Sequence, residues 1–199
     1  MTAAALLLPD RAYASTDGGR KKVAVVLSGG GAKGMAHIGA LRVIEKAGIP
    51  IDIITGTSMG SIVGGLYAIG YDAHRLDSMV RVQDWSFLLT DKLEAHSPLL
   101  DNRERQNTYF LTKTFTLSKN KITNKQGGMI EGRNLDKLFN RLTAGYRDSI
   151  DFNSLPIPFA CVATNIVDNS EYVMHSGVLS EAMRSSMAIP GVFSPVRKR

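Results

Sequence analysis

The fold is decided by residues 51–60, which have the sequence IDIITGTSMG. A short β-branched run ends there in Gly-x-Ser-x-Gly, and an apolar segment with helical spacing follows it. This order predicts a strand, a tight turn and a helix, with Ser58 at the apex of the turn. Gly56 and Gly60 fit that geometry, because a sharp turn crowds the backbone against the helix and leaves no room for a Cβ. The pattern therefore predicts Ser58 as a catalytic nucleophile.

A second glycine-rich turn lies upstream of the first. Residues 23–28, VAVVLS, predict a fully buried strand that leads directly into residues 29–34, GGGAKG. Apolar residues then recur at helical spacing over residues 35–47, and Gly48 ends the segment. The first N–H groups of a helix have no partner within that helix. Such a loop can therefore bind a phosphate or the oxyanion of an acyl-transfer intermediate.

Three interpretations of this loop need different residues. Gly29, Gly31 and Gly34 match the dinucleotide pattern G-x-G-x-x-G, but that site also needs an acidic residue at the end of the second strand. The second strand ends here in Ile-Thr-Gly. A P-loop needs Gly-Lys followed by Ser or Thr, whereas Lys33 is followed by glycine and methionine. Both nucleotide interpretations thus fail, while a glycine-rich connection that binds no ligand stays open.

Taken together, the two turns suit one chemistry. Acyl transfer needs a hydroxyl nucleophile and preorganised N–H donors where negative charge develops. Ser58 would supply the hydroxyl, and an oxyanion hole would be formed by the amides of Gly29, Gly30 and Gly31, together with that of Met59. The expected reaction is the hydrolysis of an ester.

These motifs resemble those of the patatin-like phospholipase family in its bacterial form. The resemblance rests on GGGAKG and GTSMG, each at a strand-to-helix turn, and its supporting positions are Lys33, Gly34, Gly56 and Gly60. Residues 157–164, IPFACVAT, and residues 182–193, AMRSSMAIPGVF, are similar to a later strand and helix of the family. The similar region extends over about residues 21–196.

The resemblance implies a three-layer α/β/α fold with a mainly parallel central sheet. Alternating strand and helix signals over residues 23–71 independently favour a parallel sheet with helices on both faces. The resemblance also implies a lipid acyl hydrolase of the phospholipase or lysophospholipase type that uses no cofactor. Its partner would be a lipid ester substrate.

The family resemblance further implies a Ser-Asp dyad, with the aspartate in an Asp-Gly-Gly or Asp-Gly-Ala motif near the end of the catalytic domain. This chain continues as SPVRKR over residues 194–199, where the next strand would bring that aspartate. Its Asp-Gly-Gly begins at Asp17, before the first strand, and would approach the site from the wrong end of the fold. We therefore identify no catalytic aspartate and expect a truncated, incomplete domain with weak or absent hydrolysis. The alternative function is an inactive fold fragment that binds lipid or a partner.

A Ser-Asp-His triad is a further alternative. Ser58, Asp168 and His175 follow the chain order of an α/β-hydrolase triad. However, Asp168 and Asn169 predict the turn of a hairpin whose return strand covers residues 172–175, which is a poor place to orient a base near Ser58. For the remaining histidines, we expect packing or solvated roles; they are His37, His74 and His96.

Composition is consistent with one α/β domain over residues 21–199. The chain is 44% hydrophobic and 21% charged, and it contains no run of 18 apolar residues that could span a membrane. Its net charge of +6 would favour peripheral contact with an anionic membrane, whereas no recognition motif points to nucleic acid. No cluster of metal ligands is apparent, so no metal is expected.

Three further segments carry expectations. Residues 1–20 predict a leader or signal-peptide remnant, because Ala-Tyr-Ala at 12–14 resembles a cleavage site although a positive n-region is missing. Export would place the protein in a bacterial cell envelope, periplasm or outer membrane, and the cytoplasm is the alternative.

Residues 91–126 form a polar insertion, which either caps the Ser58 cleft or has no part in substrate binding. The single cysteine, Cys161, is expected to be buried.

Overall fold

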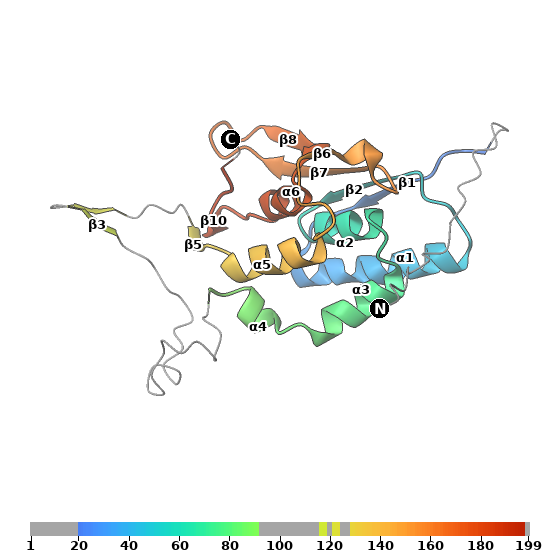
Figure 1. The fold of residues 1–199 in the computed structure, drawn as a ribbon, viewed down its shortest axis with the longest axis horizontal. Helices are drawn as coiled ribbons and strands as arrows, with labels where there is room; N and C mark the ends of the chain where they lie inside the picture. The colour runs from blue at the N-terminus through green and yellow to red at the C-terminus, as the bar shows by residue number, and fades with distance from the viewer. Residues whose placement is uncertain (1–19, 92–115, 119–120, 124–127, 198–199) are drawn as a thin grey trace, which may run out of the picture.

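A computed structural model describes residues 20–91, 116–118, 121–123 and 128–197. Its main sheet has the strand order β1-β2-β7-β8 (Figure 1). These strands are Ala24–Leu27 (β1), Ile53–Thr57 (β2), Phe159–Thr164 (β7) and Glu171–Met174 (β8). Strands β1, β2 and β7 run parallel, and β8 pairs antiparallel with β7 at one edge. The expected α/β fold with a mainly parallel sheet is confirmed.

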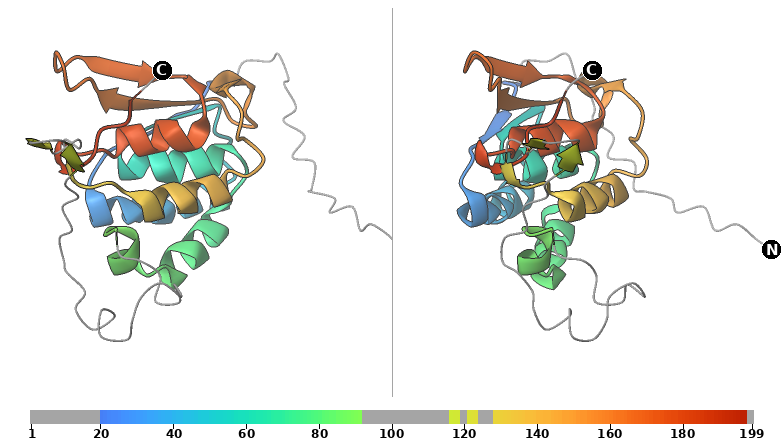
Figure 2. Two further views of the ribbon diagram at one scale, coloured as in Figure 1. Left: turned by 60° about the vertical axis from the view of Figure 1, so that its left-hand side comes forward. Right: turned by 90° about the vertical axis from the view of Figure 1, so that its left-hand side faces the viewer.

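The helices stack in layers below this sheet (Figures 1 and 2). They are Ala36–Lys46 (α1), Met59–Ala68 (α2), Ala73–Val82 (α3), Trp85–Leu88 (α4), Arg133–Leu142 (α5) and Leu179–Ser186 (α6). Helices α2 and α6 lie directly on the sheet, α1 and α5 lie beyond them, and α3 and α4 are farthest from the strands. Two 3-10 turns, Gly31–Met35 (η1) and Phe152–Ser154 (η2), complete the helical elements of the described residues.

Three small ladders accompany the main sheet. Gly128–Ile130 (β5) pairs parallel with Gly191–Phe193 (β10). The antiparallel pairs are Thr116–Ser118 (β3) with Lys121–Thr123 (β4) and Ile150–Asp151 (β6) with Ser176–Gly177 (β9). The β5–β10 ladder joins the segments that flank α5 and α6, so it holds these two helices side by side.

Exposure along the strands shows which face of the sheet is covered. In β1, Val25 and Leu27 are buried, whereas Val26 between them is 77% exposed. Ile53 of β2 and Val173 of β8 lie on the same face as Val26 and are exposed too. The expectation of a fully buried first strand is therefore wrong, because the described helices all lie on the opposite face. The third layer of the expected sandwich is not among the described residues.

Helix α2 approaches the sheet closely because glycines face its neighbours. A Cβ on Gly64 would lie 2.8 Å from Cγ2 of Ile54, and one on Gly65 would lie 3.0 Å from Sδ of Met183 in α6. Larger residues at these positions would push the helix away from the strands. The resulting core between sheet and helices includes Phe159, whose ring centroid is 5.9 Å from that of Phe152.

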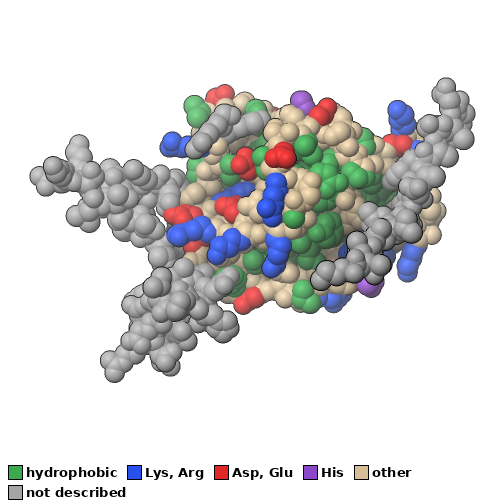
Figure 3. Space-filling model, in the orientation of Figure 1, with side chains coloured by type: hydrophobic (Ala, Val, Ile, Leu, Met, Phe, Trp, Pro, Cys, Tyr) green, Lys and Arg blue, Asp and Glu red, His purple; other side chains and the backbone are tan. Residues whose placement is uncertain are grey.

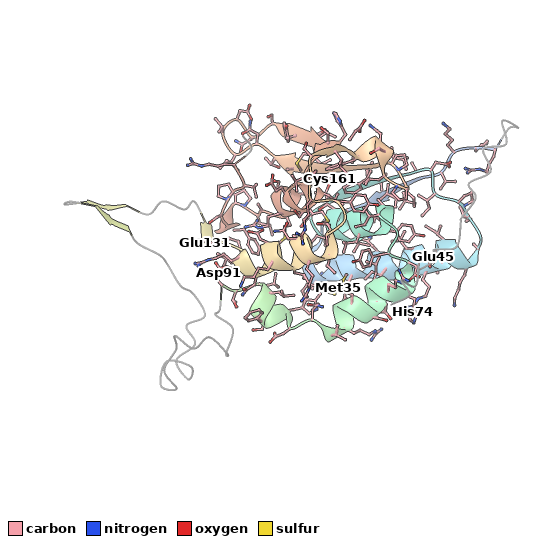
Figure 4. The ribbon with its side chains drawn as sticks, in the orientation of Figure 1. Met35, Glu45, His74, Asp91, Glu131 and Cys161 are labelled. Atoms are coloured by element: carbon pink, nitrogen blue, oxygen red, sulfur yellow. The ribbon has the colours of Figure 1, made fainter. Side chains whose placement is uncertain are left out.

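Carboxylates fix the starts of two outer helices. The Asp72 side chain accepts a hydrogen bond from the N–H of Arg75 (2.7 Å), and Glu45 of α1 accepts one from the N–H of Ala73 (3.0 Å). Asp91 accepts from the first N–H groups around α5, those of Glu131, Gly132 and Arg133 (Figure 4). Such acceptors satisfy donors that a helix leaves unpaired at its N-terminus. Residue 91 is thereby tied to α5, although it lies 40 or more residues away in the chain.

Several expectations concern residues outside the described part. The structure does not describe residues 1–19 of the leader or residues 92–115 of the insertion. The leader and the cap therefore stay predictions. None of the described helices has the length and apolar character that crossing a membrane requires. On the face seen in Figure 3, Lys and Arg side chains are mixed with Asp and Glu rather than gathered into one basic patch.

Cys161 provides a probe of this fold. Its side chain is fully buried in β7 (Figure 4), and burial raises the pKa of the thiol to about 12. We expect the native protein at pH 8 not to react with iodoacetamide, because the reagent needs an exposed thiolate. In urea the thiol should react at the rate of a free cysteine, as followed by mass spectrometry. Rapid alkylation of the folded protein would contradict the packing described for β7.

Candidate active site

Ser58 occupies the strained turn that the sequence predicts. It joins β2 to α2 with φ 53° and ψ −120°, and it precedes the first residue of the helix. Among the described residues, only Ser58 and Asn169 have a positive φ without being glycine. A side chain in this conformation costs about 1–3 kcal/mol, which the surrounding structure must offset. The turn holds a half-buried Ser58 above the carboxyl end of the sheet.

The two glycines of the motif make this turn sterically feasible. A Cβ on Gly56 would lie 2.3 Å from the carbonyl oxygen of Gly60. A Cβ on Gly60 would lie 2.1 Å from the carbonyl oxygen of Leu27, at the end of β1. Both distances are far below van der Waals contact, and both opposing atoms are backbone. The first turn of α2 therefore packs against β1 and β2 only because these residues lack side chains.

The glycine-rich loop lies directly beside Ser58. A Cβ built on Gly29 would be 3.4 Å from Cβ of Ser58, and one built on Gly34 would be 2.6 Å from Cβ of Met59. The two motifs, separated along the chain, thus meet at the carboxyl ends of neighbouring strands β1 and β2. Lys33, in contrast, is exposed.

Free backbone donors are present at this junction. Toward the residues that the structure describes, neither the Gly29 nor the Gly30 N–H donates a hydrogen bond. Gly31 opens η1 with φ 53°, so the loop itself forms a 3-10 turn, and the helix predicted over residues 35–47 is observed as α1, Ala36–Lys46. Unpaired N–H groups near a nucleophile are the donors that an oxyanion requires.

His37 orients one of these donors, a role that the sequence did not indicate. Its Nε2 donates a hydrogen bond to the carbonyl oxygen of Ser28, at 2.9 Å. The Ser28–Gly29 peptide is planar and trans, so its C=O and the N–H of Gly29 point in opposite directions. By holding the carbonyl, His37 fixes the direction of the Gly29 N–H. This role is compatible with the expectation that His37 is no catalytic base.

Ser186 and Ser61 support the nucleophile turn, and sequence reasoning missed both. The Ser58 N–H donates to Oγ of Ser186 (2.8 Å), which in turn donates to the carbonyl of Val162 (2.6 Å). Oγ of Ser61 donates to the carbonyl of Ser58 (2.7 Å). Ser186 lies 128 residues from Ser58, so no local pattern could reveal the contact.

The structure does not assemble the alternative triad. Asp168 lies in the predicted β7–β8 hairpin turn and accepts hydrogen bonds from the N–H and hydroxyl of Ser170, which hold the pKa of its carboxyl below the usual range. His175 follows β8, two strands and three register positions from Ser58, or about 14 Å across the sheet. A histidine at that distance cannot take the Ser58 proton.

Neither a base nor a metal site accompanies Ser58 in the described part of the chain. Its hydroxyl makes no hydrogen bond to any described residue, and no described carboxylate contacts it. Within the described ranges there is also no group of three or more His, Cys, Asp or Glu side chains arranged to hold a metal ion. The site thus presents a hydroxyl and main-chain donors.

Comparison with known proteins shows the family to which this chain belongs. The family model described as "Patatin-like phospholipase" matches residues 25–199. The chain is 33% identical over 174 residues to mouse patatin-like phospholipase domain-containing protein 6, and 32% identical over 187 residues to lysophospholipase NTE1 of Kluyveromyces lactis. Each match covers 87% of this chain, but only 11% and 10% of those proteins. The chain therefore belongs to the patatin-like phospholipase family.

A solved structure is also similar. The type III effector protein ExoU aligns with 85% of this chain and 40% of its own, at 18% sequence identity and a TM-score of 0.46. The chain spans about a tenth of the curated relatives that it matches.

Because the backbone at Ser58 is strained, a glycine variant at this position should be more stable than an alanine variant. Ser58→Gly and Ser58→Ala both remove the hydroxyl, but only glycine adopts φ 53° without strain. We expect Ser58→Gly to be more stable than Ser58→Ala by about 1 kcal/mol in urea unfolding. Equal stabilities, or a more stable alanine variant, would show that the turn is not strained.

Alanine variants of Ser186 and of the adjacent Ser185 test whether Ser186 supports the Ser58 turn. Ser186→Ala leaves the N–H of Ser58 without its acceptor, which should lower the free energy of unfolding by about 1–2 kcal/mol. Ser185 donates a hydrogen bond to the carbonyl of Glu181 within its own helix and is partly exposed. Ser185→Ala should therefore change the free energy of unfolding by less than about 0.5 kcal/mol. Urea titrations followed by circular dichroism measure both. A larger loss for Ser185→Ala would refute the assigned support.

Proposed function

We propose that this protein is a serine acyl hydrolase that acts on phospholipid or lysophospholipid esters through Ser58. The observation that carries the proposal is the contact between the strained Ser58 turn and the unpaired N–H groups of Gly29 and Gly30. Support comes from the family and from relatives that are named phospholipases and lysophospholipases. A nucleophile beside preorganised donors is what ester cleavage requires.

The proposed reaction has two steps. A base takes the Ser58 proton, the oxygen attacks the ester carbonyl, and the negative charge moves to the carbonyl oxygen beside Gly29, Gly30 and Gly31. Collapse of this intermediate breaks the C–O bond, and the leaving alcohol takes the proton from the base. Water then cleaves the acyl-serine and releases a fatty acid. Each oxyanion donor can lower the barrier by about 3 kcal/mol.

The base in this proposal is an aspartate, as the family resemblance implies. The described residues place no carboxylate at the Ser58 hydroxyl, so we assign the role to none of them. The alternative function, a fold that binds lipid or a partner without turnover, draws support from the same observation. The two functions differ in whether Ser58 is chemically reactive.

Membrane contact completes the proposal. The net charge of +6 would draw the protein to an anionic lipid surface, which would bring the site to its substrate. On the face seen in Figure 3, basic and acidic side chains alternate, so this face carries no single basic patch that would focus the attraction. Export to a bacterial cell envelope, with the lipid substrate in the neighbouring membrane, also remains a proposal.

Fluorophosphonate labelling tests the proposed nucleophile. The reagent phosphonylates activated serines, so we expect label on the peptide that contains Ser58 and none after Ser58→Ala. Ser28, exposed on the adjacent loop, supplies a control, because Ser28→Ala should retain the label. Failure to label a folded sample would favour the non-enzymatic alternative.

A further inference from the structure

Two adjacent apolar side chains are exposed at the tip of the β7–β8 hairpin. Ile166 is 53% exposed and Val167 is 90% exposed, which makes Val167 the most exposed large apolar side chain among the described residues. Neither of them packs against the hydrophobic core. Single exposed apolar side chains are common on protein surfaces. Here two of them follow each other in one turn, so their presence needs a physical reason.

The polar residues of the turn account for its shape. Oδ1 of Asn165 accepts a hydrogen bond from the N–H of Val167 (3.0 Å), and the Asn165 carbonyl accepts one from the N–H of Asn169 (2.8 Å). The Asp168 carboxylate accepts from the N–H two residues later (2.9 Å), and Asn169 has a positive φ of 59°, which asparagine tolerates. The geometry of the turn therefore explains the asparagines and the aspartate, but it does not explain Ile166 and Val167.

The turn projects from the edge of the sheet that carries Ser58. Thr57 is level with Val162 in the parallel register of β2 and β7, so Ser58 is level with the next residue of β7, Ala163. Strand β7 ends one residue later, at Thr164, and the turn follows. It therefore extends past Ser58 in the strand direction, on the neighbouring strand. In Figures 1 and 2 the turn lies at the same end of the sheet as β10.

A third exposed apolar side chain lies at this edge. Ser186, the last residue of α6, is bonded to the N–H of Ser58 and to a carbonyl of β7, so α6 ends at the carboxyl ends of β2 and β7. Ile189 follows three residues later and is 52% exposed. We refer to Ile166, Val167 and Ile189 as the apolar rim. The apolar rim thus lies at the edge from which a substrate would reach the Ser58 turn.

The chemistry of the tip suits a zwitterionic lipid surface. A backbone N–H that enters an apolar layer needs a partner, and those of Val167 and Asn169 have acceptors within the turn. The charges close to the tip are the exposed carboxylates of Asp168 and Glu171, and residues 159–177 contain no Lys or Arg. These carboxylates repel anionic lipid, whereas they complement the outward ammonium groups of phosphatidylcholine.

We propose that the apolar rim inserts shallowly among the headgroups of a zwitterionic phospholipid surface, with Val167 deepest, and so brings Ser58 against the layer that contains the ester groups. The inference rests on the proposed function of Ser58, because the lipid that the rim contacts is the substrate of that site. Side chains of this size support weak, reversible contact rather than stable anchoring. Because the contact is apolar, salt does not weaken it, whereas salt screens an attraction between charges.

Sedimentation with phosphatidylcholine vesicles tests the contact without relying on catalysis. We expect the original chain to bind, and to bind equally well in about 0.1 M and about 0.5 M NaCl. Val167→Ser should weaken this binding about tenfold, because it removes the apolar side chain that enters the lipid. Absence of binding, or binding that needs anionic lipid and disappears at the higher salt concentration, would overturn the proposal.

Val82 supplies the matched control. It is 78% exposed and is the last residue of α3, one of the helices farthest from the strands. Val82→Ser makes the same chemical change as Val167→Ser away from the apolar rim, and it should alter vesicle binding by less than about twofold. Circular dichroism checks the fold of both variants. Equal effects of the two variants would refute the assigned surface.

A fluorescent label shows which part of the chain enters the lipid. Cys161 is fully buried, so a thiol-reactive dye should attach to the folded Val167→Cys variant at the new thiol alone. We expect the emission of a nitrobenzoxadiazole dye there to rise and shift to the blue with phosphatidylcholine vesicles, because the dye leaves water. The same dye on Val82→Cys should not respond. A response at both positions or at neither would contradict the proposal, as would a Val167-dependent dimer that does not bind vesicles.

The two proposals fail in different ways. If the fluorophosphonate labels Ser58 but Val167→Ser leaves vesicle binding unchanged, the lipid contact of the apolar rim is wrong and the hydrolase proposal stands. If the vesicles bind through Val167 but Ser58 is not labelled, the hydrolase proposal is wrong and the apolar rim is the lipid contact of a protein without turnover.

Discussion

The approach of α2 to the ends of β1 and β2 is the constraint on which the rest of the site depends. It is made through backbone atoms, since a Cβ on Gly60 would lie 2.1 Å from the carbonyl oxygen of Leu27. The glycine-rich loop starts just after Leu27, and Ser58 lies just before the helix. One packing contact therefore fixes the distance between Ser58 and the amides that we propose as oxyanion donors. A side chain at this contact would push the two turns apart.

Strain and support are balanced around Ser58. The turn holds a non-glycine residue at positive φ, which is unfavourable, and hydrogen bonds from Ser61 and to Ser186 keep it in place. His37 orients the Ser28–Gly29 peptide on the opposite side of the site.

Sequence periodicity predicted the elements near the site better than their surroundings. The strand, turn and helix at Ser58 and the β7–β8 hairpin follow from local residue preferences and are confirmed. The prediction of a fully buried β1 is wrong. An apolar run such as VAVV is compatible with burial on one face or on two, and only the position of the helices decides between them. The roles of Ser58 and the loop glycines in catalysis stay predictions.

By itself, the sequence determined the two strand-to-helix turns, because each needs glycine at fixed positions a few residues apart. Tertiary structure decided which donors meet Ser58, since they depend on β1 and β2 lying side by side. It also decided that Ser186, 128 residues away, accepts the Ser58 N–H, and that five helices leave a small apolar cavity between them. Contacts of this kind depend on how whole elements pack, and no spacing of residues within one segment encodes them.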